Sequence, residues 1–165
     1  MLEVAFLIAL AIGVGVAELS ATAIIAVMAL AFAVAGLRQV RLSDELAVIF
    51  VIDRSRSVPG EDEAAALKWV QETAKEAGRR ESVGLVVFGK EASVEVSPAP
   101  KLDLDKVHSV VSPESTDIAR ALRLAAAACP EWAQKRIVLL SDGNENSGDA
   151  AAEALAARAR GAEVW

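Results

Sequence analysis

The first forty residues are almost entirely apolar. Between residues 4 and 37 the only charged side chain is Glu18, so a helix built from this run is apolar on every face. A bilayer core takes roughly 20 apolar residues in one helix, and this run is nearly twice as long. A buried helix pair of a soluble protein would show a polar stripe. The pattern therefore predicts transmembrane helices within residues 1–40.

Two arrangements of these helices fit the sequence. In the one that we expect, residues 2–17 and 21–37 form a membrane hairpin, and in the other only residues 21–37 span the bilayer. A cleaved signal peptide does not fit, because the N-terminus lacks Lys and Arg and the second apolar run would survive cleavage. The expected location is the cell membrane. Arg38 and Arg41 weakly favour a cytoplasmic side for the residues that follow, and the sidedness stays open.

From residue 46 onward, apolar runs typical of strands alternate with helical patterns. Residues 47–52 form a continuous run rich in β-branched side chains, typical of a strand buried on both faces of a parallel sheet. We predict strands at 47–52, 83–88, 92–96, 137–140 and from 163, and helices at 59–77, 102–110, 117–129 and 150–160. This alternation predicts an α/β fold with a doubly wound, mostly parallel open sheet over residues 46–165.

Composition and charge exclude several classes of function. The chain has a net charge of −6 and no basic cluster, which argues against nucleic-acid binding. With one cysteine, Cys129, and one histidine, His108, it can form neither a disulfide framework nor a Cys/His zinc site. A Ser-His-Asp or Cys-His enzyme would depend on His108 alone.

Oxygen-bearing side chains alternate in the loop after the first predicted strand. Asp53, Ser55 and Ser57 can point the same way, while Arg54 and Arg56 point outward. In open α/β sheets, ligands bind beyond the carboxyl ends of the strands, which is where this loop lies. The two serines could instead only cap the following helix, as serine often does.

Two further loops at the same end of the sheet supply more oxygens. Thr116 adds a hydroxyl just before a helix, and Asp142 adds a carboxylate just after the fourth strand. Thr116 could be only an N-cap, and Asp142 only part of a turn with Gly143. Taken together, the side chains of the three loops offer hard oxygen ligands at low total charge. Such a set suits Mg²⁺, with Mn²⁺ or Ca²⁺ as substitutes, and leaves a coordination position vacant.

A second metal-binding pattern overlaps the last of these loops. Asp142, Asn144, Asn146 and Glu153 fall at positions 1, 3, 5 and 12 of an EF-hand-like calcium loop. The glycine that such a loop needs comes one residue late, at Gly148, and a strand rather than a helix is predicted to precede it. This alternative is therefore less favoured than a site shared by the three loops.

The three loops together resemble the von Willebrand factor A (vWA) domain. The resemblance covers about residues 47–165. It depends on D-x-S-x-S after an apolar strand, Thr-Asp at the start of a helix and Leu-Leu-Ser-Asp-Gly at the end of a strand, in that order. It implies a metal-ion-dependent adhesion site (MIDAS) with hydroxyl contacts from Ser55, Ser57 and Thr116. Asp53 and Asp142 would bind the metal directly or through water, and the vacant position would take a carboxylate from a protein partner.

The whole chain resembles bacterial membrane proteins that carry a vWA domain just after their transmembrane segments, several of which continue into an amidotransferase-like region. A vWA sheet would continue beyond the strand that begins at Glu163, and the sequence ends at Trp165. The resemblance therefore implies a domain that is C-terminally incomplete.

Three functional classes follow from these observations. The favoured one is a membrane-anchored, metal-dependent protein-binding module for adhesion or scaffolding, without catalysis, because no positioned base or activated nucleophile of recognisable type is present. The alternative is a Mg²⁺-dependent hydrolase or phosphotransferase that uses Asp53 or Asp142, although the sequence lacks a Gly-rich phosphate loop. The third is a purely structural domain.

Overall fold

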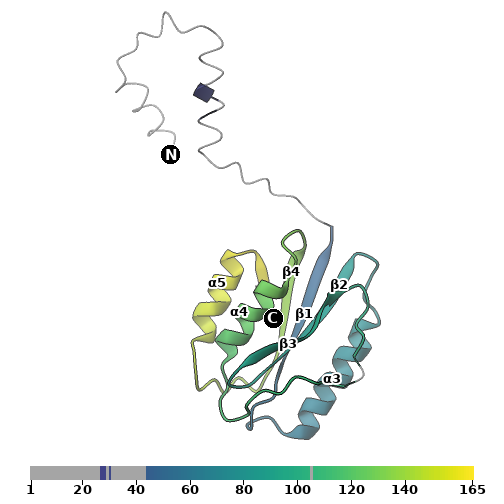
Figure 1. Ribbon diagram of the computed structural model, residues 1–165, viewed down its shortest axis with the longest axis vertical. Coiled ribbons are helices and arrows are strands. Elements are labelled where there is room, and N and C mark those ends of the chain that lie inside the picture. The colour runs from purple at the N-terminus through teal and green to yellow at the C-terminus, as the bar shows by residue number, and fades with distance from the viewer. Residues whose placement is uncertain (1–26, 29, 31–43, 105) are drawn as a thin grey trace, which may run out of the picture. The chain divides into compact units, whose positions relative to one another are not determined.

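The computed structural model describes residues 27, 28, 30, 44–104 and 106–165 (Figure 1). The chain divides into two units, Met1–Arg41 and Leu42–Trp165. The predicted membrane hairpin falls almost wholly outside the described residues. None of the helices within the described part has the length and apolar character needed to cross a membrane.

The second unit is built around a five-stranded sheet with the order β3-β2-β1-β4-β5. Its strands β1, β2, β4 and β5 are parallel, and β3 runs antiparallel beside β2. The predicted α/β fold with a mostly parallel sheet is confirmed. Its elements are β1 (Leu46–Asp53), α3 (Gly60–Ala74), β2 (Glu81–Phe88), β3 (Ala92–Ala99), α4 (Ile118–Ala128), β4 (Gln134–Leu140), α5 (Ala150–Ala159) and β5 (Ala162–Val164).

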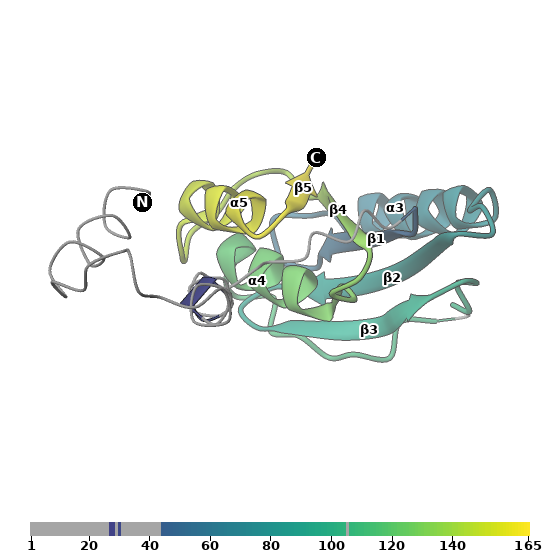
Figure 2. The same cartoon turned by 90° about the horizontal axis from the view of Figure 1, so that it is seen from above.

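Helices cover both faces of the sheet, as Figure 2 shows: α4 and α5 lie on one side and α3 on the other. Strand β1 is central, and its side chains alternate between the two cores because successive strand residues point to opposite faces. Ile49 and Val51 belong to the core under α4 and α5. Phe50 and Ile52 belong to the core under α3. The continuous apolar run of β1 thus reflects burial on both faces.

The expected helix over residues 102–110 is wrong, because the described residues of this segment form no helix. Leu102 and Val107 pack against the core under α3, as their apolar character suggested. Val110, by contrast, is 95% exposed. Leu104 packs against the same core, so the apolar spacing arises from an irregular segment with three inward contacts and not from a helix.

Hydrogen bonds to other elements explain why this segment is not helical. The Glu95 carboxylate of β3 accepts the backbone N–H groups of His108 at 2.7 Å and Ser109 at 2.8 Å. The Leu104 carbonyl accepts the side-chain amide of Gln71 at 2.8 Å. Burial alone would raise the pKa of Glu95, but the hydrogen bonds from His108 and Ser109 outweigh it and lower the pKa. Side chains of β3 and α3 therefore use backbone groups that a helix would bond internally.

Glu153 of α5 makes two ion pairs, one with Arg123 of α4 and one with Arg160 at the C-terminal end of α5 itself. Its carboxylate accepts Arg123 at 2.8 Å and Arg160 at 2.6 Å, and the residue is 9% exposed. Hydrogen bonds from Arg123 and then from Arg160 lower the pKa of Glu153 below its ordinary value. Both oxygens are engaged with arginine, so the structure contradicts the calcium-loop alternative, which needs Glu153 as a ligand.

Replacing Glu153 with glutamine is expected to lower the melting temperature at neutral pH and to matter less in acid. Because the folded-state pKa is depressed, the stabilisation is present above the ordinary pKa of 4.5. It is lost as the pH falls through the folded value. The effect should be about 1 kcal/mol at most, because both arginine side chains are more than half exposed and screened by solvent. Thermal melts of Glu153→Gln and wild type from about pH 7 to about pH 3 measure the gap.

The matched control is Glu76→Gln, which removes an exposed carboxylate in the residues after α3. This variant should melt like wild type over the same pH range. If the difference in melting temperature between Glu153→Gln and wild type stays constant down to the lowest pH, the ionised carboxylate of Glu153 does not stabilise the fold through its ion pairs.

Candidate metal site

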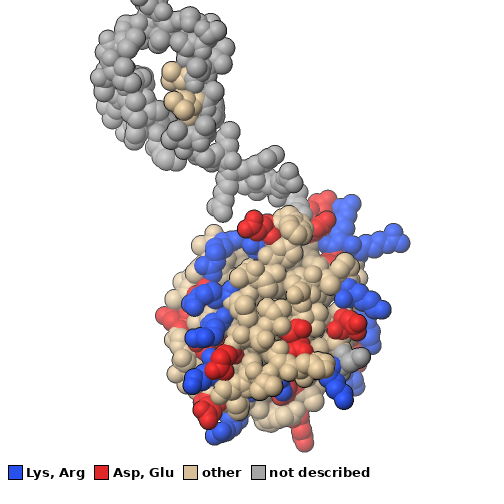
Figure 3. Space-filling view, in the orientation of Figure 1, with Lys and Arg blue, Asp and Glu red and all other residues tan. Residues whose placement is uncertain are grey.

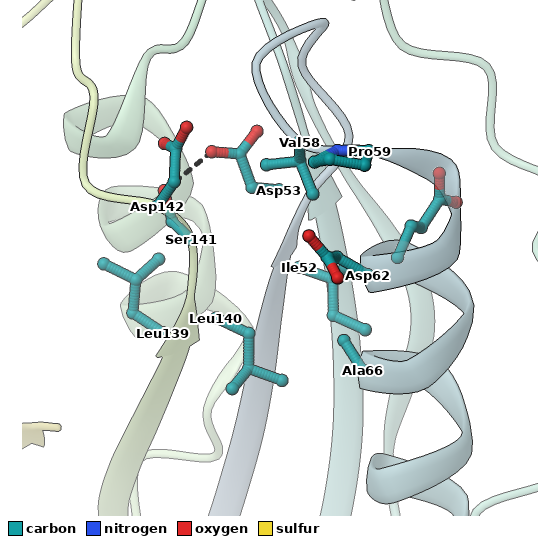
Figure 4. A pocket seen from close by; sticks show the side chains of 11 residues that line it. Ile52, Asp53, Val58, Pro59, Asp62, Ala66, Leu139, Leu140, Ser141 and Asp142 are labelled. Atoms are coloured by element: carbon teal, nitrogen blue, oxygen red, sulfur yellow. Dashed lines mark hydrogen bonds between the residues drawn. The ribbon is translucent and has the colours of Figure 1, made fainter.

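Asp53 ends β1 and lies buried at the carboxyl edge of the sheet, with 1% of its surface exposed. The Ser55 backbone N–H donates to its Oδ1 at 2.8 Å. Ser141 directly follows β4, and its hydroxyl donates to Oδ2 of Asp53 at 2.7 Å, the contact drawn dashed in Figure 4. The buried carboxylate is therefore fixed by its own loop and by the neighbouring strand.

The hydroxyls of Ser55 and Ser57 face each other, with 2.9 Å between their Oγ atoms. The Ser57 hydroxyl also lies close enough to the Asp142 carboxylate to affect its pKa. The backbone N–H of Asn144, and then its side-chain amide, lower the pKa of Asp142 most, and Ser57 adds to this effect. The two carboxylates and the two serine hydroxyls thus form one connected group, in agreement with their alternation in the sequence.

Thr116 is 2% exposed and is held at the same edge by hydrogen bonds between loops. Its backbone N–H donates to Oδ1 of Asn146 at 2.9 Å, and its carbonyl accepts the Asn146 backbone N–H at 3.2 Å. The Ser115 hydroxyl donates to the same Asn146 oxygen at 2.6 Å. The Arg56 backbone N–H, in the first loop, donates to the Pro113 carbonyl at 2.8 Å. The structure therefore joins all three predicted loops.

Comparison with known proteins agrees with this arrangement. A family model described as the von Willebrand factor type A domain matches residues 48–145. The matched range is well over half of the chain and contains every residue of the predicted site. The chain belongs to the vWA family.

Solved structures show the same fold. An aerotolerance-related membrane protein from Bacteroides fragilis aligns with a TM-score of 0.59 and 24% identity, over 72% of this chain and 65% of that one. BatB from Bacteroides thetaiotaomicron aligns with a TM-score of 0.60 and 24% identity, over 72% of this chain and 64% of that one. The alignments thus cover slightly less than two thirds of the length of either protein. No curated protein matches it significantly.

A third vWA structure contains a metal. Proximal thread matrix protein 1 from the mussel byssus, with a zinc-occupied MIDAS motif, aligns with a TM-score of 0.55 and 20% identity. The alignment covers 73% of this chain and 37% of that protein. At these identities the likeness shows the fold alone, so the ligands of this vWA chain have to be argued from its own residues.

The simpler interpretations of the hydroxyl residues do not hold. Pro59 is the N-cap of α3, and no side-chain hydrogen bond caps that helix. Asp117 is the N-cap of α4, where its carboxylate accepts the Arg120 backbone N–H at 2.8 Å. Neither the two serines nor Thr116 is therefore needed as a helix cap.

The turn interpretation of Asp142 does hold. Its carboxylate accepts the Asn144 backbone N–H at 3.0 Å, and Gly143 takes a positive φ of 79°. The glycine is required because other residues rarely adopt this backbone conformation. The turn positions Asp142 beside Ser57, so its structural role and a role as a ligand are compatible.

The loop residue Arg54 was expected to point outward, and this was wrong. Its Nε atom donates to Oε1 of Glu63 at 2.6 Å, and its Nη1 atom donates to the Ser109 carbonyl at 2.9 Å. Only 28% of its side chain is exposed. Arg54 ties the first loop both to α3 and to the irregular segment after β3.

Sequence reasoning did not identify Ser141 and Asn146 as parts of the site. Ser141 directly precedes Asp142, so its place at the end of β4 was the available signal. Asn146 was considered only for the calcium-loop alternative, and nothing in the sequence indicated its contacts with Ser115 and Thr116, which cross thirty or more residues.

The donor set fits a hard divalent cation. It combines two carboxylates with three hydroxyls, and Asp142 is held ionised by its hydrogen bonds. Among the described residues, no group of three or more His, Cys, Asp or Glu side chains could hold a metal. A metal at this edge would therefore require the hydroxyl oxygens, which Mg²⁺ and Mn²⁺ accept as ligands.

Replacing Asn146 with alanine is expected to weaken Mg²⁺ binding about tenfold, because supporting residues around a metal site typically contribute 10- to 100-fold. The substitution removes the oxygen that orients Thr116, while the exposed position limits any effect on folding. Titration calorimetry with Mg²⁺ and Mn²⁺ measures the change.

Asn146→Asp is the matched control, because it keeps an oxygen acceptor at the same place and should retain most of the affinity. Equal affinities in wild type and Asn146→Ala would show that the position of Thr116 does not matter for the metal.

Proposed function

We propose that residues 46–165 form a metal-dependent protein-binding module whose site takes Mg²⁺. The observation that supports it best is the connected group of oxygens at the end of the central strand, with Asp53 buried at its base. A buried carboxylate is costly unless it is paired or binds a metal. Asp53 has hydrogen-bond donors around it but no ion pair within the described part of the chain.

In this proposal, the hydroxyls of Ser55, Ser57 and Thr116 bind the ion, and Asp53 and Asp142 bind it directly or through water. Two carboxylates balance the charge of one divalent ion, and neutral hydroxyls add none. The ion then keeps its attraction for a further anionic ligand at the vacant position. A carboxylate from a protein partner fits that position, since hard cations prefer oxygen ligands.

Binding rather than catalysis is favoured because, among the described residues, no histidine lies beside the candidate ligands. His108 is the single histidine of the chain; its side chain is 82% exposed and lies 3.5 Å from Glu95 on β3. A general base needs to be within hydrogen-bond reach of the reacting group. The contacts described for His108 involve the segment after β3 and not the candidate metal site.

We also propose that residues 1–40 anchor this module to the cell membrane. The apolar run is long enough for two spans, and the Bacteroides fragilis relative is described as a membrane protein. The chain should stay in the membrane fraction after carbonate extraction, and deletion of residues 1–38 should release it. Full solubility of the intact chain would contradict the anchor.

The binding function is tested with the full chain in detergent over a polyaspartate-coated sensor surface. Retention is expected with Mg²⁺, is expected to disappear with EDTA, and should be absent for Asp53→Ala in either condition. The same samples are assayed for hydrolysis of p-nitrophenyl phosphate. Retention that is indifferent to metal, or phosphoester turnover that Asp53→Ala abolishes, would contradict a pure binding module.

A further inference from the structure

A pocket of about 360 Å³ opens directly beside the candidate metal site. It lies between the first turns of α3 and the carboxyl ends of β1 and β4, as Figure 4 shows. Asp53 and Asp142 belong both to the pocket lining and to the candidate metal ligands. Any partner that places a carboxylate on the metal therefore has neighbouring atoms at the mouth of this pocket.

The pocket combines apolar walls with acidic groups. Its walls include Ile52, Val58, Ala66 and Leu140. In Figure 4, the Asp62 carboxylate extends from α3 into the space between this helix and β4. A ligand that suits this lining needs an apolar body and a positive end.

The charge balance of the pocket singles out Asp62. The pocket lining holds four carboxylates, those of Asp53, Asp62, Glu63 and Asp142. Glu63 is paired with Arg54 at 2.6 Å, and a divalent ion would balance Asp53 and Asp142. Within the described residues Asp62 has no ion pair, and it is exposed to a partner. One negative charge is left at the pocket mouth.

We propose that this pocket receives a lysine or arginine side chain of the same protein partner whose carboxylate binds the metal. This inference rests on the proposed function. Lysine and arginine bury their methylene stems along apolar surface and keep the charged head near polar groups, which matches apolar walls with Asp62 at the mouth. A wholly apolar side chain would cover Asp62 without a partner, and an acidic one would be repelled.

The surface charge of the domain agrees with a partner that offers both signs. On the face drawn in Figure 3, lysine and arginine side chains are interspersed with acidic ones along both flanks, so this face presents no extended basic area. Recognition then depends on local groups: the metal for the carboxylate and Asp62 for the cation. The partner sequence should carry one acidic and one basic residue close together.

The test uses immobilised synthetic peptides with one fixed aspartate in a Gly/Ser background. Lysine, norleucine or glutamate is placed in turn at each position on either side of the aspartate. The full chain in detergent is passed over them with Mg²⁺ or with EDTA. We expect Mg²⁺-dependent retention to be about fivefold stronger for lysine than for norleucine at one or two positions, and weakest for glutamate.

Two variants separate the pocket from the metal site. Asp62→Asn should erase the preference for lysine while its Mg²⁺ affinity by calorimetry stays unchanged. Glu61→Gln is the matched control, because it removes an acidic residue of the same helical turn that does not line the pocket, and it should keep the preference.

The outcomes distinguish this inference from the function on which it rests. Mg²⁺-dependent retention without a preference for lysine, or with the same preference in Asp62→Asn, overturns the basic-side-chain pocket and leaves the metal-dependent function standing. A preference for norleucine shows an apolar occupant and overturns it too. The absence of any Mg²⁺-dependent retention overturns both.

Discussion

Replacing Asp53 with alanine is expected to abolish Mg²⁺ binding. Asp53 is the most buried acidic side chain at the candidate site, and its two oxygens are fixed by Ser55 and Ser141. Loss of a supporting residue around a metal typically costs 10- to 100-fold in affinity, so loss of a carboxylate ligand should exceed about 100-fold. Titration calorimetry measures the affinity. Thermal melts should show that saturating Mg²⁺ stabilises wild type by about 2.7 kcal/mol at 100 times its dissociation constant and leaves the variant unchanged.

Two further variants guard against a trivial loss of folding. Asp53→Asn keeps the size of the side chain and an oxygen for the Ser55 backbone N–H, so it should fold in the absence of metal and still fail to bind Mg²⁺. Asp44→Asn removes a carboxylate that is 80% exposed and paired with Arg80; it should bind like wild type. Unchanged Mg²⁺ affinity in Asp53→Ala and Asp142→Ala would show that the candidate site is not a metal site.

Replacing Gly89 with alanine is expected to destabilise the domain and to weaken metal binding. A Cβ atom at this position would lie 2.3 Å from the Ser112 carbonyl oxygen, which is backbone and cannot turn aside. The Lys90 backbone N–H donates to that oxygen at 2.9 Å, and the Gly89 carbonyl accepts the Asp117 backbone N–H at 3.0 Å. Relief of the clash therefore has to move the segment that carries Thr116.

Overpacking of this kind costs about 1–3 kcal/mol, and we expect Gly89→Ala to lie at the upper end because the obstacle is main chain. Urea unfolding measures the loss, and calorimetry measures the accompanying loss of Mg²⁺ affinity.

The control is Gly60→Ala at the start of α3, where a Cβ atom would meet nothing within 4 Å. Alanine stabilises such a position by about 0.4–1 kcal/mol, because it restricts the unfolded chain. Equal stability of the two variants would show that the residues after β2 do not approach the 112–117 segment as closely as described.

Much of the fold could be predicted from local pattern. The apolar run of β1 predicts a strand buried on both faces, and the observed strand sends Ile49 and Phe50 into different cores. The helix expected from residue 117 is confirmed with Asp117 as its cap. These elements were predictable because each depends on side-chain periodicity and on short-range hydrogen bonds. The segment at 102–110 was not, because Glu95 and Gln71 bond to its backbone from other elements.

The candidate site divides in the same way. By itself, the sequence determined that Asp53, Ser55 and Ser57 follow a buried strand in alternation, and that Thr116 and Asp142 lie in loops at the same end of a parallel sheet. Such placement follows from strand direction alone. Only the tertiary structure decided that Glu153 serves two arginines, that Arg54 turns inward to Glu63, and that Asn146 orients Thr116. Each of these contacts either joins residues that are distant in the sequence or competes with an equally good local contact. Which contact forms therefore depends on how the packed sheet and helices bring the loops together.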